Sequence, residues 1–406
     1  MAWKIVSGSW RGKMENVLVV ASVASMIYQF IVPDIKLFQE LGYHVDVACN
    51  YLEGSSCSKE CVAELEKNLK ILGVGCFQVD FARNVARIDR NMKAYHQLDL
   101  LAKKKKYDFV HCHTPIGGAL GRIVFQKYRK TGTKVVYTAH GFHFFKGSPL
   151  RNWILYYPVE KFLSRWTDCL ITINKEDYGR AKKRFHAKRT EYVPGVGIDL
   201  EKFSVPDLIL DKDNVQIPYL VWKEKKRKEL GIGVDDFVIV SVGELNANKN
   251  HRIVIEAIAQ MKNKKVKYLV CGQGNLKNEL TKLIKKHRLE QQVFLLGFCN
   301  DVRNVLWIGN LFAFPSKREG LPVALMEAMA CGIPCLVSDI RGNRDLFGKE
   351  DVKYLLPTNQ PQKWANSIEY CIAHSKDEME TAKKKQKKML AFSKDRVIRK
   401  IRRIYI

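Results

Sequence analysis

Short runs of apolar and β-branched residues recur along the chain, and segments with helical spacing separate them. A first series of runs lies between residues 17 and 174: VLVVA, HVDVAC, FQVDF, YDFVHCH, KVVYTAH and CLITIN. A second series lies between residues 237 and 357: FVIVSVGE, KYLVCG, VFLLGF, LFAFPS, IPCLVSD and VKYLLP. Strands that alternate with helices in this way are typical of βαβ units, whose parallel sheet is covered by helices on both faces.

The two series predict an α/β protein with two Rossmann-like, doubly wound domains. Between them, PGVGIDLEKFSVPDLILDKDNVQIPYLVW mixes Pro, Gly and charge without sustained periodicity, which is typical of a connection. We expect the N-terminal domain over residues 14–200, a linker or insertion over 201–225 and the C-terminal domain over 226–376. Residues 1–13 are interpreted as an N-terminal extension, and 377–406 as a basic helix that packs back on the first domain.

Ligands of open parallel sheets bind at the carboxyl ends of the strands, so two such domains facing a central cleft can share one site. The uncharged stretch NVLVVASVASMIYQFIVP, residues 16–33, is near the length of a membrane span. Ser22, Ser25 and Gln29 interrupt it. A buried parallel strand followed by a loop and a helix explains this stretch better.

Composition indicates an ordinary globular protein with a strongly basic surface. Of the 406 residues, 46% are hydrophobic and 27% are charged, and 69 Lys and Arg against 42 Asp and Glu give a net charge of +27. Such a field favours anionic partners, whether nucleotide phosphates, a lipid headgroup layer or nucleic acid. The basic residues are dispersed, and we find no zinc finger, basic zipper or RNP-like segment, so we do not expect a nucleic-acid partner.

The 11 cysteines indicate reduced thiols in a cytosol, because their number is odd and the chain is large, with no recognisable secretion signal. Two C-x₃-C pairs, Cys57/Cys61 and Cys331/Cys335, raise the question of a metal site. Neither pair fits a common zinc pattern without a second matching pair, so we expect no metal.

The segment REGLPVALMEAMACGIPCLVSD, residues 318–339, places Glu319 and Glu327 around a predicted helix start. Pro322 is expected in the first turn, where a missing N–H costs nothing, and Gly332 at the helix end. The free amides and the positive dipole end of such a helix favour a phosphate or a sugar hydroxyl. Carboxylates accept hydrogen bonds from vicinal hydroxyls, so the pair suits a nucleotide-sugar. From spacing alone, the alternative remains that one Glu stabilises the helix dipole and the other lies on a solvated face, without a ligand.

The pattern P-S-x-x-E-G-L-P-x-x-x-x-E-A-M-A-C-G-x-P in this region resembles the E-x₇-E signature of the family 4 glycosyltransferases, which are retaining enzymes of the GT-B fold. Four further stretches resemble the subgroup that builds bacterial capsular and exopolysaccharides: SDIRGNRDL, TINKED, YTAHGFHF and VGELNANKNH. The resemblance covers roughly residues 15–400. It implies two Rossmann-like domains, a nucleotide-sugar donor and catalysis without a cofactor or metal.

The resemblance also implies roles for residues of the second domain. Glu327 would hold the donor ribose, and Glu319 would contact the donor sugar near its 3-hydroxyl. Lys249 would neutralise the diphosphate leaving group. Backbone groups would hold the distal phosphate, the sugar and the nucleobase edge; the donor-binding residues for these contacts are Gly320, Leu321, Val323, Gly297 and Phe298.

In the first domain, His140 matches the family histidine that touches the sugar near its 6-position. His113 has the same strand-end location and is assigned to the acceptor side, whereas His111 and His143 are interpreted as structural. We count His140, Glu319 and Lys249 as the catalytic residues.

The chain departs from the family pattern at two places. The family's GR-x₄-K element appears here as G-E-L-N-A-N-K, so that Glu244 replaces an arginine whose charge would stabilise the departing diphosphate. We expect Arg318, Asn248 or backbone amides to compensate. The loop ASVASMIYQF after the first strand also lacks the glycine pair of many relatives, which argues against a phosphate role for Ser22 to Ser25.

These observations predict a retaining glycosyltransferase that moves a sugar from a UDP-sugar to a lipid-linked or saccharide acceptor. A front-face substitution needs positioning and charge stabilisation more than a strong base. A same-fold nucleotide-sugar epimerase and a catalytically silent subunit of an assembly complex remain alternatives. Motif residues retained at four positions argue against the silent subunit.

The positive charge predicts a cytoplasmic protein that associates with the inner face of the plasma membrane. KKKK at 103–106, AKKRFHAKR at 181–189 and the cluster HFFKGSPLRNWILYYPVEKFLSRW combine charge with interfacial aromatic residues. An anionic membrane surface is therefore an expected partner, beside the donor and a lipid-linked saccharide acceptor. An ordinary solvated basic surface is the alternative.

Overall fold

The structure, a computed structural model, describes residues 15–53, 58–211 and 214–406. The described residues form two compact units. The first runs to Ile173 and adds Asp177–Tyr192 and Lys400–Ile406, and the second takes Asn174–Glu176 and Val193–Arg399. The predicted N-terminal extension and Cys57 of the first C-x₃-C pair lie outside the described residues.

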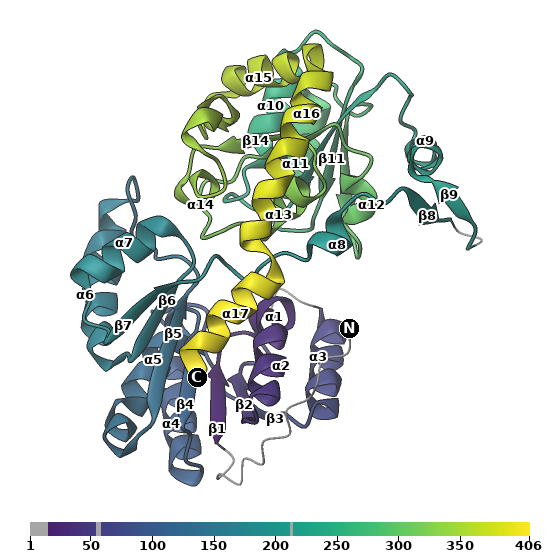
Figure 1. Ribbon diagram of the computed structural model, residues 1–406. Helices are drawn as coiled ribbons and strands as arrows, with labels where there is room; N and C mark the ends of the chain where they lie inside the picture. The colour runs from purple at the N-terminus through teal and green to yellow at the C-terminus, as the bar shows by residue number, and fades with distance from the viewer. Residues whose placement is uncertain (1–14, 54–57, 212–213) are drawn as a thin grey trace. The chain divides into compact units, whose positions relative to one another are not determined.

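The first unit contains a parallel sheet of seven strands in the order β3-β2-β1-β4-β5-β6-β7 (Figure 1). Its strands are β1 (Asn16–Val20), β2 (His44–Cys49), β3 (Gly75–Gln78), β4 (Phe109–His113), β5 (Lys134–Ala139), β6 (Cys169–Thr172) and β7 (Arg189–Tyr192). Six were predicted from apolar runs. The edge strand β7 was not, because RTEY is polar and lacks the apolar run of a central strand.

Helical segments connect these strands. They are α1 (Ala24–Met26), the π-helical η1 (Ile27–Ile31), α2 (Val32–Glu40), α3 (Lys59–Ile71), α4 (Ile88–Lys104), α5 (Pro115–Phe125), η2 (Gln126–Thr131), α6 (Leu150–Leu163), η3 (Ser164–Trp166) and α7 (Lys175–Arg184). The uncharged stretch at 16–33 is thus a buried strand and a short helical run, as predicted. No helix among the described residues is long and apolar enough to cross a membrane.

The second unit repeats the design with a six-stranded parallel sheet in the order β12-β11-β10-β13-β14-β15. Its strands are β10 (Phe237–Val242), β11 (Val266–Cys271), β12 (Val293–Gly297), β13 (Leu311–Phe314), β14 (Cys335–Ser338) and β15 (Leu355–Leu356). In both sheets the first strand lies in the interior, and the order in which strands are added changes side once. This reversal lies between β1 and β4 in the first sheet and between β10 and β13 in the second. Ligands of such sheets bind at this reversal, outside the carboxyl ends of the strands.

The predicted α/β class with two Rossmann-like sheets is therefore confirmed. The helices of the second unit are α8 (Leu200–Phe203), α9 (Tyr219–Glu229), α10 (His251–Gln260), α11 (Lys277–Lys286), α12 (Arg303–Leu306), α13 (Val323–Ala330), α14 (Arg341–Arg344), η4 (Lys349–Tyr354), α15 (Pro361–Ala373), α16 (Ser375–Gln386) and η5 (Lys387–Phe392). The last helix, α17 (Lys394–Tyr405), begins in the second unit, and its residues from Lys400 onward belong to the first. The connection rich in Pro and Gly also carries an antiparallel pair, β8 (Leu208–Leu210) and β9 (Gln216–Pro218).

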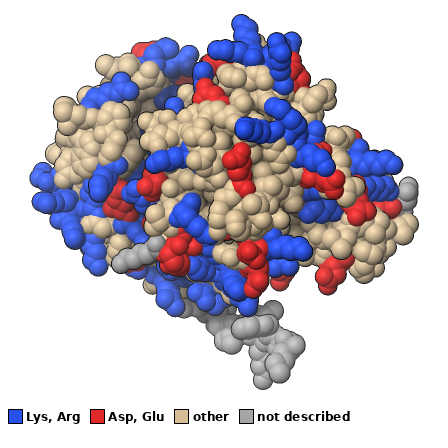
Figure 2. Space-filling view, turned by 90° about the horizontal axis from the view of Figure 1, so that it is seen from above, with Lys and Arg blue, Asp and Glu red and all other residues tan. Residues whose placement is uncertain are grey.

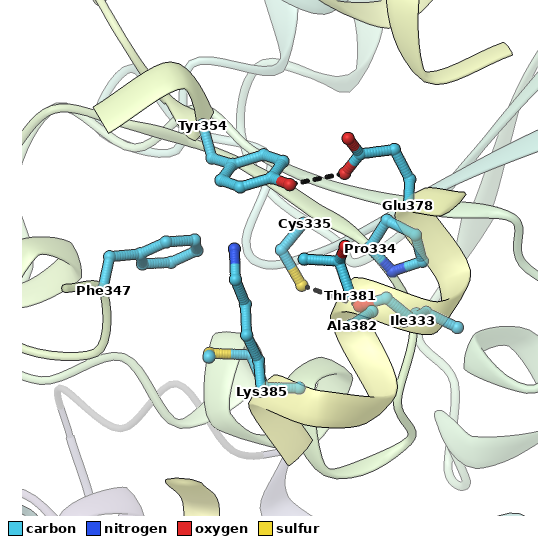
Figure 3. A pocket seen from close by; sticks show the side chains of 10 residues that line it. Ile333, Pro334, Cys335, Phe347, Tyr354, Glu378, Thr381, Ala382 and Lys385 are labelled. Atoms are coloured by element: carbon cyan, nitrogen blue, oxygen red, sulfur yellow. Dashed lines mark hydrogen bonds between the residues drawn. The ribbon is translucent and has the colours of Figure 1, made fainter. Parts of the chain in front are cut away.

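The basic segment near the end of the sequence consists of α16, the 3₁₀ segment η5 and α17. α16 is fixed in the second unit by Lys385, whose ammonium lies 2.7 Å from Asp351 and 3.6 Å from the ring centroid of Tyr354. Glu378 accepts a 2.6 Å hydrogen bond from the hydroxyl of Tyr354 (Figure 3). The cavity that these side chains line holds about 10 Å³, which leaves room for a water molecule but not for a ligand.

Candidate functional site

The reversal of the second sheet brings the loop after β10 beside the loop after β13. In the first loop, the side-chain oxygen of Asn246 accepts hydrogen bonds from the amides of Asn248 (3.0 Å) and Lys249 (2.9 Å). The two loops are joined by bonds from the Lys317 amide to the Asn248 carbonyl (2.8 Å) and from the Asn248 side chain to the Arg318 carbonyl (2.9 Å). These contacts fix the backbone position of Lys249.

Lys249 and Glu319 meet at this place. The Lys249 ammonium lies 2.7 Å from Glu319 Oε1 and 5.1 Å from the ring centroid of Phe314. Both side chains are partly accessible, at 22% and 15%. At Gly243 a Cβ atom would lie 3.1–3.3 Å from the stem of Lys249, so a glycine there leaves room for the lysine. The sequence predicted both residues as catalytic, and the structure brings them together as an ion pair.

The start of α13 presents backbone donors beside this pair. Among the described residues, no acceptor is paired with the amides of Gly320, Leu321, Val323 or Ala324. The sequence predicted Pro322 in the first turn, whereas the structure places it just before the helix. Gly332 ends the helix with a φ of 71°. Unpaired amides at a helix start can bind an anion, and the anion site predicted here stays a prediction.

The neighbouring helix α14 supports this helix start. Arg341, which is buried, donates from Nε to the carbonyl oxygen of Glu319 at 3.4 Å. A Cβ atom on Gly342 would lie only 2.5 Å from the carbonyl oxygen of Gly320. The backbone of α14 therefore packs directly on the backbone of the predicted phosphate cradle. Sequence reasoning missed both contacts, although SDIRGNRDL stood out as a motif.

Glu327 lies one turn inside α13 and is half-buried. Burial raises the pKa of its carboxyl to about 7, although the positive charges of Lys202 and Lys394 oppose the shift. The carboxyl is therefore close to half protonated at neutral pH. It can accept hydrogen bonds from hydroxyl groups and, when protonated, donate one.

Gly297 ends β12 and Phe298 follows it at the same edge of the sheet. The carbonyl of Gly297 accepts a 2.7 Å bond from the amide of Gly272, and a Cβ on Gly272 would lie 1.9 Å from the Gly243 carbonyl. The ends of β10, β11 and β12 are thus packed backbone to backbone. Phe298 is 67% exposed, so its ring is accessible to a ligand.

The expected replacements for the family arginine have different surroundings. Glu244 and Arg318 are both exposed. The side chain of Asn248 already binds the Arg318 carbonyl, so the described contacts use Asn248 to join the loops. Lys249 and the α13 amides are consequently the donors that the structure assembles around Glu319.

The first unit contains the two predicted histidines at adjacent strand ends. His113 Nδ1 lies 3.1 Å from His140 Nε2, and the ring of His113 packs against that of His111 with centroids 4.1 Å apart. Burial lowers the pKa of His140 to about 4 and that of His111 to about 3. Burial also lowers the pKa of His113, helped by its two histidine neighbours. All three rings are therefore neutral near pH 7 and act by hydrogen bonding.

The loop after β1 closes on its own unit. The Ser22 hydroxyl lies 2.7 Å from Thr114 Oγ1 and accepts a 2.9 Å hydrogen bond from the amide of Gly117. The Ser22 amide donates to the same threonine oxygen at 3.0 Å. These bonds occupy the groups that a phosphate would need, in agreement with the doubt that the glycine-free sequence raised.

The described residues contain no group of three or more His, Cys, Asp or Glu side chains placed to hold a metal ion. Of the two C-x₃-C pairs, Cys331 and Cys335 are buried free thiols, and Cys335 Sγ donates to the Ile333 carbonyl at 3.3 Å. Burial raises the pKa of Cys331 to about 12, so its thiol is protonated at neutral pH.

Comparison with known sequences matches both halves of the chain. The profile described as "Glycosyl transferases group 1" matches residues 223–389, and that described as "Glycosyltransferase Family 4" matches residues 35–202. EpsD of Bacillus subtilis (strain 168), which is provisionally named a glycosyltransferase, is 33% identical over 96% of this chain and 96% of its own. The UDP-Gal:alpha-D-GlcNAc-diphosphoundecaprenol alpha-1,3-galactosyltransferase of Escherichia coli is 32% identical over 72% of this chain and 73% of its own.

Solved structures show the same fold. The crystal structure of Anabaena HepE in complex with UDP aligns with a TM-score of 0.74 at 18% identity, covering 97% of this chain and 99% of that one. WaaG, a glycosyltransferase involved in lipopolysaccharide biosynthesis, aligns with a TM-score of 0.67 at 16% identity over 96% and 99% of the two chains. The predicted GT-B class is thereby confirmed.

Proposed function

Because this chain belongs to the family 4 glycosyltransferases, we propose that it is a retaining hexosyltransferase that uses a UDP-sugar. The proposed acceptor is a saccharide linked through diphosphate to a polyprenyl lipid, and the proposed pathway is exopolysaccharide or capsule synthesis. Two observations outside the site support these assignments. The galactosyltransferase relative acts on a diphosphoundecaprenol-linked sugar, and the HepE structure contains UDP.

One observation carries the proposal: the Lys249–Glu319 ion pair lies beside the unpaired amides at the start of α13. The diphosphate of the donor would be held by those amides and by the Lys249 ammonium, which would neutralise the charge that develops when UDP departs. Glu319 holds the ammonium in place from the other side. Its second oxygen is left to accept a hydrogen bond from the donor sugar.

Glu327 would bind the ribose hydroxyls from within the same helix. In its ionised form the carboxylate would accept hydrogen bonds from both hydroxyls. Gly297 and Phe298, at the end of β12, would contact the uracil edge.

Transfer with retention follows from positioning. The bond from the anomeric carbon to the UDP phosphate oxygen breaks while the acceptor oxygen attacks the same face. The acceptor proton passes to the departing phosphate oxygen, so that no protein base is required. His140 is neutral near pH 7 and would orient the sugar through a hydrogen bond.

A panel of nucleotide sugars tests the donor assignment. A UDP-sugar that binds only the folded state should raise the melting temperature, and UDP alone should raise it less. Incubation of that donor with a polyprenyl-diphosphate saccharide should give an α-linked product, identified by its anomeric proton coupling. Inversion at the anomeric carbon, or stabilisation by no nucleotide sugar at all, would contradict the proposal.

We further infer that the first unit docks on an anionic membrane through α6. Five apolar side chains on this helix are 49–73% exposed: Leu150, Ile154, Leu155, Val159 and Phe162. The single acid of the helix, Glu160, is buried and lies 2.8 Å from Arg122. α6 therefore combines an open apolar face with no exposed carboxylate, which fits a lipid surface better than water.

A basic groove adjoins this face. Phe162 packs on Trp166 with ring centroids 4.9 Å apart, and Trp166 lines a groove of about 640 Å³ together with four basic side chains, namely Lys127, Arg129, Lys130 and Lys188. Among the described residues, two carboxylates pair with these cations, Asp99 with Lys127 and Asp168 with Arg129 and Lys188. The excess charge would attract anionic headgroups beside the inserted apolar face. Elsewhere, Figure 2 shows Lys and Arg scattered over the face in view, as expected for dispersed positive charge.

A further inference from the structure

A column of buried polar rings in the first unit ends at a residue of α17. The Tyr405 hydroxyl lies 2.7 Å from His111 Nδ1, although the two residues are 294 positions apart in the sequence. His111 Nε2 lies 2.8 Å from Thr138 Oγ1. Both ring nitrogens of His111 are therefore occupied, and the plane of the ring is fixed from both sides.

The donors in this column can be assigned from chemistry. A phenol is a stronger hydrogen-bond donor than an aliphatic alcohol, and the Tyr405 hydroxyl is buried with His111 as the polar partner that the structure gives it. Tyr405 therefore donates to His111 Nδ1. The His111 proton then resides on Nε2 and is donated to Thr138, so that one tautomer is selected.

The next ring depends on His111 for its orientation. The ring of His113 packs against that of His111 at a tilt of 33°, and its Nδ1 lies 3.1 Å from His140 Nε2. Its other nitrogen, Nε2, is buried without a hydrogen-bond partner among the described residues. Hydrogen bonding thus fixes His113 at one nitrogen only, and the face of His111 supplies the remaining restraint.

We propose that Tyr405 is a positioning residue for His140, acting through the tautomer and plane of His111 and the ring of His113 packed against it. The proposal deepens the proposed function, since it rests on His140 orienting the donor sugar. It assigns to α17 a role in the site of the first unit beyond packing.

The other contacts of Tyr405 would keep this residue in place if its hydroxyl were removed. Its ring packs against Phe38 and Phe109, with centroids 4.6 and 5.0 Å apart, and its carbonyl accepts a 3.1 Å bond from the Tyr43 hydroxyl. Arg402 adds an ion pair with Glu40 at 2.9 Å. Removal of the Tyr405 hydroxyl should therefore leave α17 in place, which separates positioning from anchoring.

Two tyrosine-to-phenylalanine variants make the test. Tyr405→Phe deletes the hydrogen bond to His111. Tyr43→Phe deletes the hydrogen bond to the Tyr405 carbonyl, which does not reach the histidines. The first readout is the imidazole ¹⁵N spectrum of His111, His113 and His140, which reports tautomer and hydrogen bonding without any substrate. The second is sugar transfer, resolved into kcat and the donor KM.

We expect Tyr405→Phe to move the His111 nitrogens toward a mixed tautomer, to shift those of His140, and to lower kcat about tenfold with little change in KM. Tyr43→Phe should leave the spectra and kcat unchanged. Thr138→Val, which removes the bond at the other nitrogen of His111, should shift the same resonances.

The proposal is overturned if Tyr405→Phe leaves the His140 nitrogens unmoved, or if both phenylalanine variants lower kcat equally. A wild-type protein that transfers no sugar would defeat the proposed function instead, and the imidazole spectra would still decide whether Tyr405 positions His140.

Discussion

The ammonium of Lys249 lies 2.7 Å from Glu319 Oε1, and the two residues come from loops that follow adjacent strands at the reversal of the second sheet. Each was predicted separately from a family motif. If Lys249 neutralises the diphosphate as proposed, this contact would hold the cation in place before the donor arrives, which would limit the reorganisation that the reaction requires.

Replacement of Lys249 by methionine tests this arrangement. We expect kcat to fall about 10²–10³-fold, as is typical when one donor to a developing oxyanion is removed. The melting temperature should change little, because both partners of the pair are partly solvated. Lys267→Met is the matched control, since Lys267 lies 3.8 Å from Asp236 at similar burial in the same unit. Equal activity of Lys249→Met and the control would remove Lys249 from the site.

Glu327 should make the stability of the protein depend on pH. Burial raises its pKa from an ordinary 4.5 to about 7, so in this window the folded protein holds a proton that the unfolded chain has released. Stability is therefore lost as the pH rises through the window, by up to roughly 3 kcal/mol. Glu327→Gln should abolish transfer and yet exceed the wild type in melting temperature at pH 8 but not at pH 4.5.

Glu290→Gln serves as the control for this titration, because Glu290 is exposed in the same unit. Melting curves of the wild type and both variants between pH 4.5 and 8 give the comparison. Parallel curves for wild type and Glu327→Gln would show that the carboxyl titrates normally.

The contact between α14 and the phosphate cradle predicts a specific effect of a single methyl group. Gly342→Ala would place a Cβ 2.5 Å from the Gly320 carbonyl, so the cradle must shift. We expect the donor KM to rise at least about tenfold, since small displacements of positioning groups are costly. Gly179→Ala meets no atom within 4 Å in helix α7 and should be neutral or slightly stabilising. Isothermal titration with UDP measures the difference, and unchanged affinity in Gly342→Ala would refute the contact's role.

Membrane docking through α6 predicts a charge-dependent interaction. Ile154→Glu should weaken binding to vesicles containing phosphatidylglycerol at least about tenfold, because insertion of one such side chain is worth about 1.5–3 kcal/mol. Leu220→Glu, at an equally exposed leucine of α9 in the other unit, is the matched control. Vesicle flotation at low and high salt gives the readout. Equal binding to neutral vesicles, or equal loss in both variants, would contradict the proposal.

The regular part of the fold could be predicted from the sequence because central parallel strands are buried on both faces. β1 illustrates this, since Val17–Val20 are fully buried and appear as an uninterrupted apolar run. β7 escaped prediction because its RTEY sequence carries no apolar signal. β15 is only two residues long, although VKYLLP suggested a full strand, because its first residues form the 3₁₀ segment η4.

The candidate site was predictable where a motif is local and not where contacts are distant. Glu319 and Glu327 lie within one continuous motif, and the unpaired amides of α13 follow from the position of Pro322. The ion pair between Lys249 and Glu319 joins residues 70 positions apart, and nothing in either motif requires it. The bond from Tyr405 to His111 spans 294 positions and joins residues that were interpreted as parts of a basic helix and of a structural strand.

That last bond also bears on the order in which the chain acquires its structure. The first unit takes Lys400–Ile406 as its final segment, and these residues follow the whole of Val193–Arg399, which belongs to the second unit, in the sequence. During synthesis on the ribosome, the sheet of the first unit is therefore made early but waits for Tyr405 to cover Phe38, Phe109 and His111. A chain that ends before Lys400 would lack Tyr405 and would expose this apolar surface to chaperones.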